Sequence, residues 1–369
     1  MTAADSEDAG RRPAGTLRRG WTTGACAAAA AGAAATALLT GHFPGQARVR
    51  LPRGLVGHFP LATARHDGVS ATAGIVKDAG DDPDDTHGLE VRATVARAAP
   101  GTGIGFAAGE GVGTVTLPGL PLGVGEPAIN PAPRAMIAAA LRDAAEAADA
   151  ATDLRVTIAI PGGAEVAKRT MNPRLGIVGG LSVLGTTGIV VPYSCAAWIA
   201  SIRRGIDVAR AQGHTHIAAA TGRTSEAAVQ ALHGLPETAL IDMGDFVGGL
   251  LRYLARHPVE RLTVAGGFAK LAKLAQGALD LHSARSRVDL DGLATLLAGT
   301  GAPAYDVAAA RSASGAGAVL AQAGDHAPAL ATAVARRARD TVRAALPGRV
   351  AVDVAVFDRA GLLLGRDGP

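Results

Sequence analysis

The chain has 369 residues, 48% of them hydrophobic and only 3% aromatic, so its core must be built mainly from Ala, Val, Leu and Ile. This length predicts roughly two domains, and a charged fraction of 18% argues against a disordered chain. The net charge is +4, and the sequence contains no Lys/Arg runs interleaved with aromatic residues. This pattern favours a small acidic partner over nucleic acid.

The first predicted element is an Ala-rich helix from Ala25 to Leu39, which begins after Thr22-Thr23-Gly24 and ends near Gly41. Residues 1–15, which precede it, are predicted to form a disordered tail. The unpaired amides of its first turn make a candidate anion site, and the alternative is a plain capped helix. Arginine pairs before the helix resemble a twin-arginine signal. We reject an export or membrane segment because the apolar stretch is short and almost all Ala, and we expect a cytoplasmic protein.

Residues 16–150 are predicted to form an α+β domain, because short β-like runs alternate with turns before a helix. The Pro-rich segment Gly125–Arg134 should be extended, and a helix should follow it to about Ala148. The predicted strands are Ala47–Leu51, Val69–Val76, Leu89–Ala96 and Val112–Leu117.

Residues 151–369 are predicted to form a Rossmann-like parallel sheet with helices on both faces, because continuous apolar strands alternate with helices. A ligand is then expected beyond the carboxyl ends of the strands. The predicted strands are Arg155–Ile160, Ile189–Val191, His216–Thr221, Ala239–Asp242, Arg261–Ala265 and Val350–Phe357. The predicted helices are Ala196–Gln212, Glu226–Leu232, Phe246–Arg256 and Asp325–Ala345.

The segment Gly176–Gly188 places five glycines in thirteen residues, between branched apolar residues. Glycine allows a ligand to approach bare backbone, so the segment predicts a turn that cradles a nucleotide-like ligand. Close packing alone is the alternative.

The segment Lys77–Gly88 concentrates five carboxylates and one His. It can be a metal loop, although the Glu of a calcium loop is missing, or a solvated acidic turn. A third interpretation is the lip of a substrate cleft, with Lys77 or His87 touching a carboxylate. The two cysteines, Cys26 and Cys195, exclude a disulfide framework, and no Cys/His cluster suggests zinc.

Together these segments resemble the cobalt-precorrin-5B C(1)-methyltransferase family (CbiD), from about residue 17 to 315. The resemblance implies an S-adenosylmethionine-dependent enzyme of anaerobic cobalamin biosynthesis that methylates carbon 1 of cobalt-precorrin-5B to give cobalt-precorrin-6A. It implies no protein-bound metal, because the cobalt belongs to the substrate, a polycarboxylate tetrapyrrole. The motifs are Arg19–Ala29, Lys77–Gly88, Gly109–Gly113, Gly125–Arg134, Lys168–Pro173, Gly176–Gly188, Thr221–Glu226, Asp242–Phe246 and Lys270–Ser283.

Chemical arguments then suggest site residues, although none is assigned as catalytic. The sequence is compatible with a homo-oligomer. The residues expected to bind the methyl donor are Gly179, Gly180, Gly185 and Gly188, with Asp242 as a ribose partner. The residues expected to bind substrate carboxylates are Thr22, Thr23, Gly24, Arg134, Lys168 and Arg169.

Two other functions remain as alternatives. A nicotinamide-dependent reductase would need GxGxxG after the first strand of the second domain, where only Gly162-Gly163 follows. A non-catalytic corrinoid carrier would need the acidic-substrate site without a donor pocket.

Overall fold

The computed structural model describes residues 16–346, 348 and 350–369, so the predicted tail at residues 1–15 lies outside the described residues. The chain divides into two compact units, which we call unit 1 (up to Ser194) and unit 2 (Cys195–Pro369). This division differs from the predicted boundary at residue 151. The strand that follows this boundary, β9 (Leu154–Ala159), pairs with β6 (Glu90–Arg97) and β7 (Ile104–Ala108), so it belongs to the sheet of unit 1.

Unit 1 contains a five-stranded mixed sheet of order β4-β5-β6-β9-β7, in which only β7 and β9 run parallel. Alternate side chains of its strands are buried, as expected for a sheet covered on one face. Its other elements are β1 (Gly20–Trp21), α1 (Thr23–Thr40), β2 (Ala47–Arg50), β3 (Val56–Phe59), β4 (Thr63–His66), β5 (Ser70–Val76), β8 (Thr114–Val115), α2 (Pro131–Ala147), α3 (Gly163–Ala167), β10 (Ile177–Val178) and β11 (Ile189–Val190).

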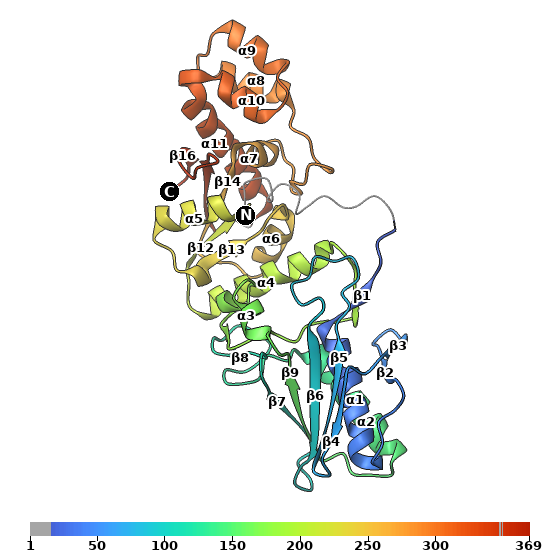
Figure 1. The fold of residues 1–369 in the computed structure, drawn as a ribbon. Helices are drawn as coiled ribbons and strands as arrows, with labels where there is room; N and C mark the ends of the chain where they lie inside the picture. The colour runs from blue at the N-terminus through green and yellow to red at the C-terminus, as the bar shows by residue number, and fades with distance from the viewer. Residues whose placement is uncertain (1–15, 347, 349) are drawn as a thin grey trace. The chain divides into compact units, whose positions relative to one another are not determined.

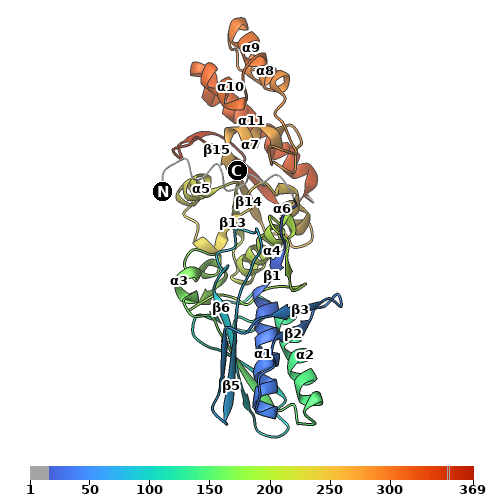
Figure 2. The same ribbon diagram turned by 45° about the vertical axis from the view of Figure 1, so that its right-hand side comes forward.

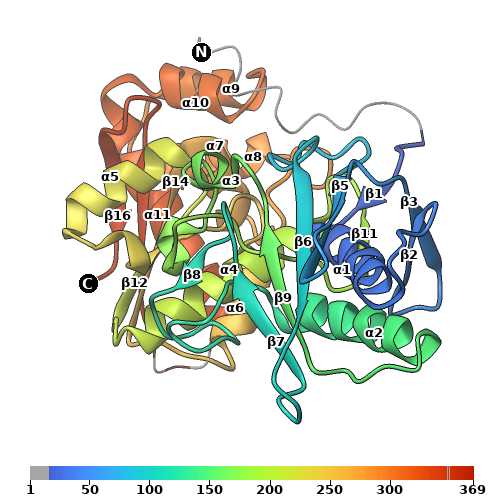
Figure 3. The same ribbon diagram turned by 60° about the horizontal axis from the view of Figure 1, so that its bottom comes forward.

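Helix α1 lies between the sheet and α2, and both helices lie on the same side of β5 and β6 (Figures 1 and 3). The residues from Ala25 to Ala31 are fully buried, because small side chains let the neighbouring elements approach the helix closely. At Gly32 an added Cβ would lie 3.3 Å from the Cβ of Ala140 in α2. The predicted helix is confirmed, with Thr22 as N-cap and Gly41 as left-handed C-cap.

Among the described helices, α1 alone is long and apolar enough to span a membrane by length and composition. The sequence-based judgement that it is too short was therefore wrong. Burial of 78% of this stretch is what a core helix shows, and it is the stronger observation.

Unit 2 contains a five-stranded sheet of order β13-β12-β14-β15-β16, in which the first four strands are parallel and β16 is antiparallel. Its elements are α4 (Cys195–Ala211), β12 (His216–Ala220), α5 (Arg223–His233), β13 (Leu240–Asp242), α6 (Val247–Leu254), β14 (Arg261–Gly267), α7 (Phe268–Ala275), α8 (Leu290–Ala298), α9 (Ala304–Arg311), α10 (Ala316–Gln322), α11 (Ala327–Ala345), β15 (Ala351–Phe357) and β16 (Leu363–Asp367).

Helices cover both faces of this sheet, as predicted. Helix α5 packs on one face through Val229, against Ala218, Ala265 and Phe357. Helices α4, α6, α7 and α11 share the core of the opposite face, and Figure 2 shows α5 and α6 on opposite sides of the strands. The α/β class is thereby confirmed, and the parallel sheet lies in unit 2.

Candidate functional site

Several motif segments that lie far apart in the sequence meet in unit 1. Strand β1 pairs with β11, so the start of α1 lies beside the end of the Gly176–Gly188 segment. The Thr22 amide donates to the Gly188 carbonyl at 3.0 Å, and the Gly113 amide donates to the Leu181 carbonyl at 2.9 Å. Three of the motifs, Arg19–Ala29, Gly109–Gly113 and Gly176–Gly188, are therefore connected by backbone hydrogen bonds within unit 1.

Close contacts with the chain itself explain three of the four glycines predicted to hold the donor. An added Cβ would lie 2.3 Å from the Gly111 backbone at Gly180, 2.2 Å from the Thr22 hydroxyl at Gly185 and 2.4 Å from Leu51 at Gly188. At Gly179 a Cβ would have no described heavy atom within 4 Å. Close packing is therefore sufficient to explain glycine at three of these four positions, whereas the fourth, Gly179, faces open space.

The first turn of α1 also makes its hydrogen bonds within unit 1. The Thr22 hydroxyl accepts from the Ala25 amide at 3.2 Å. The Gly24 amide donates to the Leu184 carbonyl at 2.8 Å, and the Cys26 amide donates to the Thr22 carbonyl. These amides are not open to an anion, so the capped-helix alternative describes this terminus. Thr23 is buried beside them.

The three predicted cationic residues differ in what they contact. The Arg134 guanidinium donates to the Ile129 and Pro127 carbonyls, lies 3.4 Å from Glu126 and covers the Phe106 ring. It therefore holds the Pro-rich segment in place.

Lys168 and Arg169 lie on the surface just after α3. Lys168 forms an exposed ion pair with Glu165 at 2.7 Å. An exposed pair of this kind is weak, so a carboxylate ligand can compete for the Lys168 ammonium.

The acidic segment Lys77–Gly88 is ordered by its own ion pairs. The buried Lys77 ammonium contacts the Asp84 carboxylate and the Thr86 hydroxyl. Burial raises the pKa of Asp84, but the Lys77 charge together with the hydrogen bonds from Lys77 and Thr86 leaves the pKa below its usual value. The Arg18 hydrogen bond lowers the pKa of Asp78 to about 2. The Lys77 ammonium is therefore used within the segment, whereas the His87 side chain is half exposed.

The parallel strands of unit 2 end at a common edge, which we call the carboxyl edge. The register places Ala220 beside Asp242 on one side and beside Ala265 on the other. After β12 the chain turns to one neighbour, β13, and then crosses back to β14 on the other side. Ligands of open α/β sheets bind at such a reversal. The turn residues there are Gly222 and Gly267, and a Cβ at either would have no described heavy atom within 4 Å.

A lysine connects the strand ends across this edge. The Lys270 ammonium, from α7, donates to the Thr221 carbonyl at 3.0 Å and lies 3.1 Å from Asp245 Oδ1. The sequence analysis placed Asp242 at this edge, and the structure agrees in placing it at the end of β13. The structure does not place Asp242 in the same unit as Gly179, Gly180, Gly185 and Gly188.

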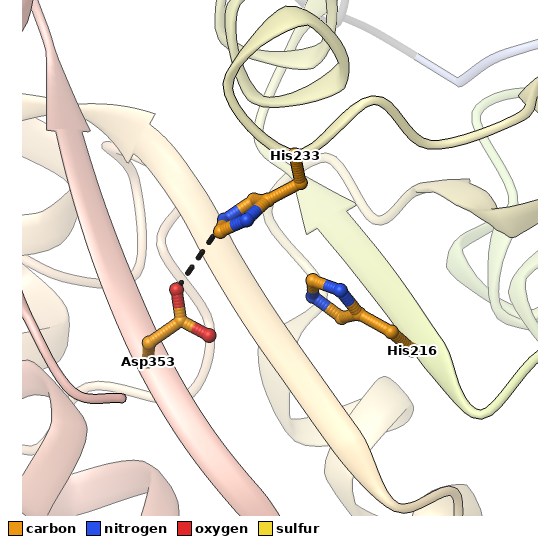
Figure 4. A group of neighbouring side chains, drawn as sticks. All are labelled: His216, His233 and Asp353. Atoms are coloured by element: carbon orange, nitrogen blue, oxygen red, sulfur yellow. Dashed lines mark ion pairs between the residues drawn. The ribbon is translucent and has the colours of Figure 1, made fainter.

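A buried polar cluster lies near the opposite, amino ends of the same strands (Figure 4). Asp353 is fully buried, accepts from the Thr263 hydroxyl at 2.8 Å and pairs with Arg261 at 3.2 Å and Arg366 at 3.4 Å. His216 Nε2 lies 2.8 Å from the Thr263 hydroxyl, and His233 Nε2 lies 3.5 Å from Asp353 Oδ2.

The electrostatics of this cluster favour neutral imidazoles. Burial, followed by the Arg261 charge, lowers the pKa of His216 to about 4. Burial also lowers the pKa of His233, against the opposing effect of Asp353.

Within the described part of the chain, His216, His233 and Asp353 form the one group whose ligand atoms lie close enough, within 4.8 Å, to suggest a metal. Two observations argue against that function. The Thr263 hydroxyl donates to Asp353 and lies 2.8 Å from His216 Nε2, so both groups already have a hydrogen-bond partner within the protein. Two guanidiniums already neutralise the carboxylate. The cluster is therefore a hydrogen-bonded charge network that connects β12, β14, β15 and α5.

Sequence reasoning missed two features of unit 2. It did not single out Trp198, which lies at the carboxyl edge, because a single Trp in a helical stretch carries no motif. It also did not connect His216 with Asp353, because no spacing in the sequence relates the two residues.

The sequence matches the family described as CbiD over residues 11–192 and the family described as CbiD, C-terminal domain, over residues 280–368. It is 61% identical to a cobalt-precorrin-5B C(1)-methyltransferase of Bradyrhizobium sp., over 95% of this chain and 93% of that protein. The protein of that name from Methylorubrum extorquens is 57% identical, over 96% and 98% of the two chains. A crystal structure of a cobalamin biosynthesis protein from Archaeoglobus fulgidus is 28% identical and covers 73% of this chain and 84% of its own, with a TM-score of 0.41.

Proposed function

Because this chain belongs to the CbiD family, we propose that it transfers a methyl group from S-adenosylmethionine to carbon 1 of cobalt-precorrin-5B, giving cobalt-precorrin-6A. The observation that carries the proposal is 61% identity, over nearly the whole of both chains, with a relative that bears this activity in its name. The chain is accordingly a methyltransferase of cobalamin biosynthesis.

The chemistry asks little of protein nucleophiles. A nucleophilic ring carbon attacks the sulfonium methyl group, the carbon–sulfur bond breaks, and the sulfur leaves as neutral S-adenosylhomocysteine. The protein must hold donor and acceptor in line and keep water away, and positioning of this kind supplies up to about 7–11 kcal/mol in favourable cases.

We place the donor at the carboxyl edge of unit 2. The reversal of strand order between β12 and β14 supports this placement, as do the open glycines Gly222 and Gly267. Asp242, at the end of β13, remains the proposed ribose partner. For the acceptor, we keep Lys168 and Arg169 as proposed partners of substrate carboxylates, because both side chains are exposed.

The function is tested by turnover. Purified protein is incubated anaerobically with cobalt-precorrin-5B and S-adenosylmethionine carrying a ¹³CH₃ group, and the tetrapyrrole is analysed by mass spectrometry. Incorporation of one labelled methyl group at carbon 1 is expected. Binding of the tetrapyrrole without methyl transfer supports the carrier alternative, and reduction that depends on NADPH supports the reductase.

The donor site is tested by a pair of matched variants. Gly222 and Gly315 both precede a helix, both have extended φ values (166° and 163°), and a Cβ at either meets no described atom within 4 Å. Gly222→Val should abolish binding of S-adenosylhomocysteine in calorimetry, whereas Gly315→Val should bind like the wild type. Equal affinity in both variants would remove the donor from this edge.

A further inference from the structure

Trp198 is a large, exposed aromatic side chain at the carboxyl edge of unit 2. It belongs to the first turn of α4, and its indole N–H donates to the Asp242 carbonyl at 3.3 Å. Despite this fixed position, 46% of the residue remains exposed to solvent.

The helix itself explains how the ring comes to overhang the strand end. Ile202 and Ile206 are buried and follow Trp198 at intervals of four residues, so all three lie on one face of α4. The two isoleucines contribute to the core of unit 2. Trp198 lies one helical turn before Ile202, and its side chain extends beyond the core to the end of β13.

The surroundings of the indole hold it in one orientation. Gly244 adopts φ +52°, and an added Cβ there would lie 3.2 Å from the indole ring. The Phe246 ring lies 6.3 Å away, tilted by 48°. One side of the indole therefore packs on the turn after β13, while nearly half of the residue stays open to solvent.

We propose that the exposed face of Trp198 is the stacking surface for a flat conjugated ring bound at the carboxyl edge. The inference rests on the proposed function, which brings two such rings to the protein: the adenine of the donor and the macrocycle of the acceptor. Aromatic rings stack favourably in offset geometry, and an indole held in place loses little conformational freedom when it binds. The indole hydrogen bond to Asp242 places this surface next to the proposed ribose partner.

The test measures dissociation constants by calorimetry for S-adenosylhomocysteine and for cobyrinic acid, a stable corrin polycarboxylate. The variants are Trp198→Ala and Trp198→Phe, and circular dichroism checks that each is folded. Tyr305→Ala is the matched control, because Tyr305 is an exposed aromatic residue of α9, 74% accessible. Trp198→Ala should weaken one ligand about tenfold or more, Trp198→Phe should restore most of the affinity, and the control should change neither.

Each outcome decides the question. A loss confined to S-adenosylhomocysteine assigns the surface to adenine, and a loss confined to cobyrinic acid assigns it to the macrocycle. Wild-type affinity of Trp198→Ala for both ligands would overturn the inference, even if the wild-type protein turns over. Absence of methyl transfer by the wild type would instead overturn the proposed function, and would do so without reference to Trp198.

Discussion

Replacement of Asp353 by Asn tests whether the buried network stabilises unit 2. The carboxylate is fully buried and faces Arg261 and Arg366 at 3.2 and 3.4 Å. Asn has nearly the same volume as Asp but no charge. Asp353→Asn therefore leaves two guanidiniums beside a neutral amide, without opening a cavity that would complicate the result.

The expected magnitude follows from the burial of the partners. Removal of one member of a fully buried ion pair costs about 3–5 kcal/mol. The two arginine side chains are 30% and 31% exposed, so water recovers part of this loss. We expect Asp353→Asn to lower the free energy of unfolding of unit 2 by about 2–3 kcal/mol. Asp291→Asn, which removes an exposed pair with Arg311, should cost less than about 1 kcal/mol.

Urea unfolding followed by tryptophan fluorescence is a suitable assay. The chain has two tryptophans, Trp21 in unit 1 and Trp198 in unit 2. In a Trp21→Phe background the fluorescence reports unit 2 alone, which separates its transition from that of unit 1. If Asp353→Asn stays within about 0.5 kcal/mol of its parent, the guanidiniums do not depend on this carboxylate and the electrostatic reasoning fails.

Three further predictions concern pH, backbone and thiols. The pKa of His216 is lowered to about 4, so below about pH 6.5 this residue takes up a proton in the unfolded chain but not in the folded chain. The free energy of unfolding of unit 2 should therefore fall between pH 6.5 and 5, and this fall should be smaller in His216→Gln. Gly185→Ala should cost more than about 3 kcal/mol in unit 1 or prevent its folding, whereas Gly179→Ala, also at positive φ but in open space, should cost about 1 kcal/mol; equal urea midpoints would contradict the packing argument. Burial raises the pKa of Cys26 to about 12, so a disulfide reagent at pH 8 should modify only the half-buried Cys195 quickly in the native protein; rapid modification of two thiols would refute this.

Local signals in the sequence predicted the elements, but not which sheet each strand joins. The N-cap Thr22 and the glycine after the helix defined α1 closely, and apolar runs located β12, β14 and β15. The strand now called β9 looked like the first strand of a parallel sheet, because its alternating burial fits either unit. Its partners are selected by tertiary packing, which a local pattern does not encode. Strands β3 and β4 are short and partly polar, and β7 is short and carries a glycine, so none of the three stands out in the sequence.

The candidate site was predictable where a rule relates sequence to position. Because ligands bind beyond the ends of parallel strands, the order of apolar runs and turns was enough to place Asp242 at the carboxyl edge. The glycine-rich segment is where the sequence is least specific, because a glycine needed for contact with Thr22 looks the same in sequence as one needed for a ligand. The overhang of Trp198 depends on where α4 ends relative to β13, which only the folded arrangement reveals.

The pairing of β1 with β11 has a consequence for synthesis of the protein in the cell. Gly20 and Trp21 find their strand partners at Val190 and Ile189, about 170 residues later, so the β1–β11 pair forms only after the ribosome has made nearly all of unit 1. Likewise β7 gains its neighbour only when β9 emerges. Translation must therefore pass residue 190 before unit 1 can close, although α2, β5 and β6, which cover most of α1, are made earlier.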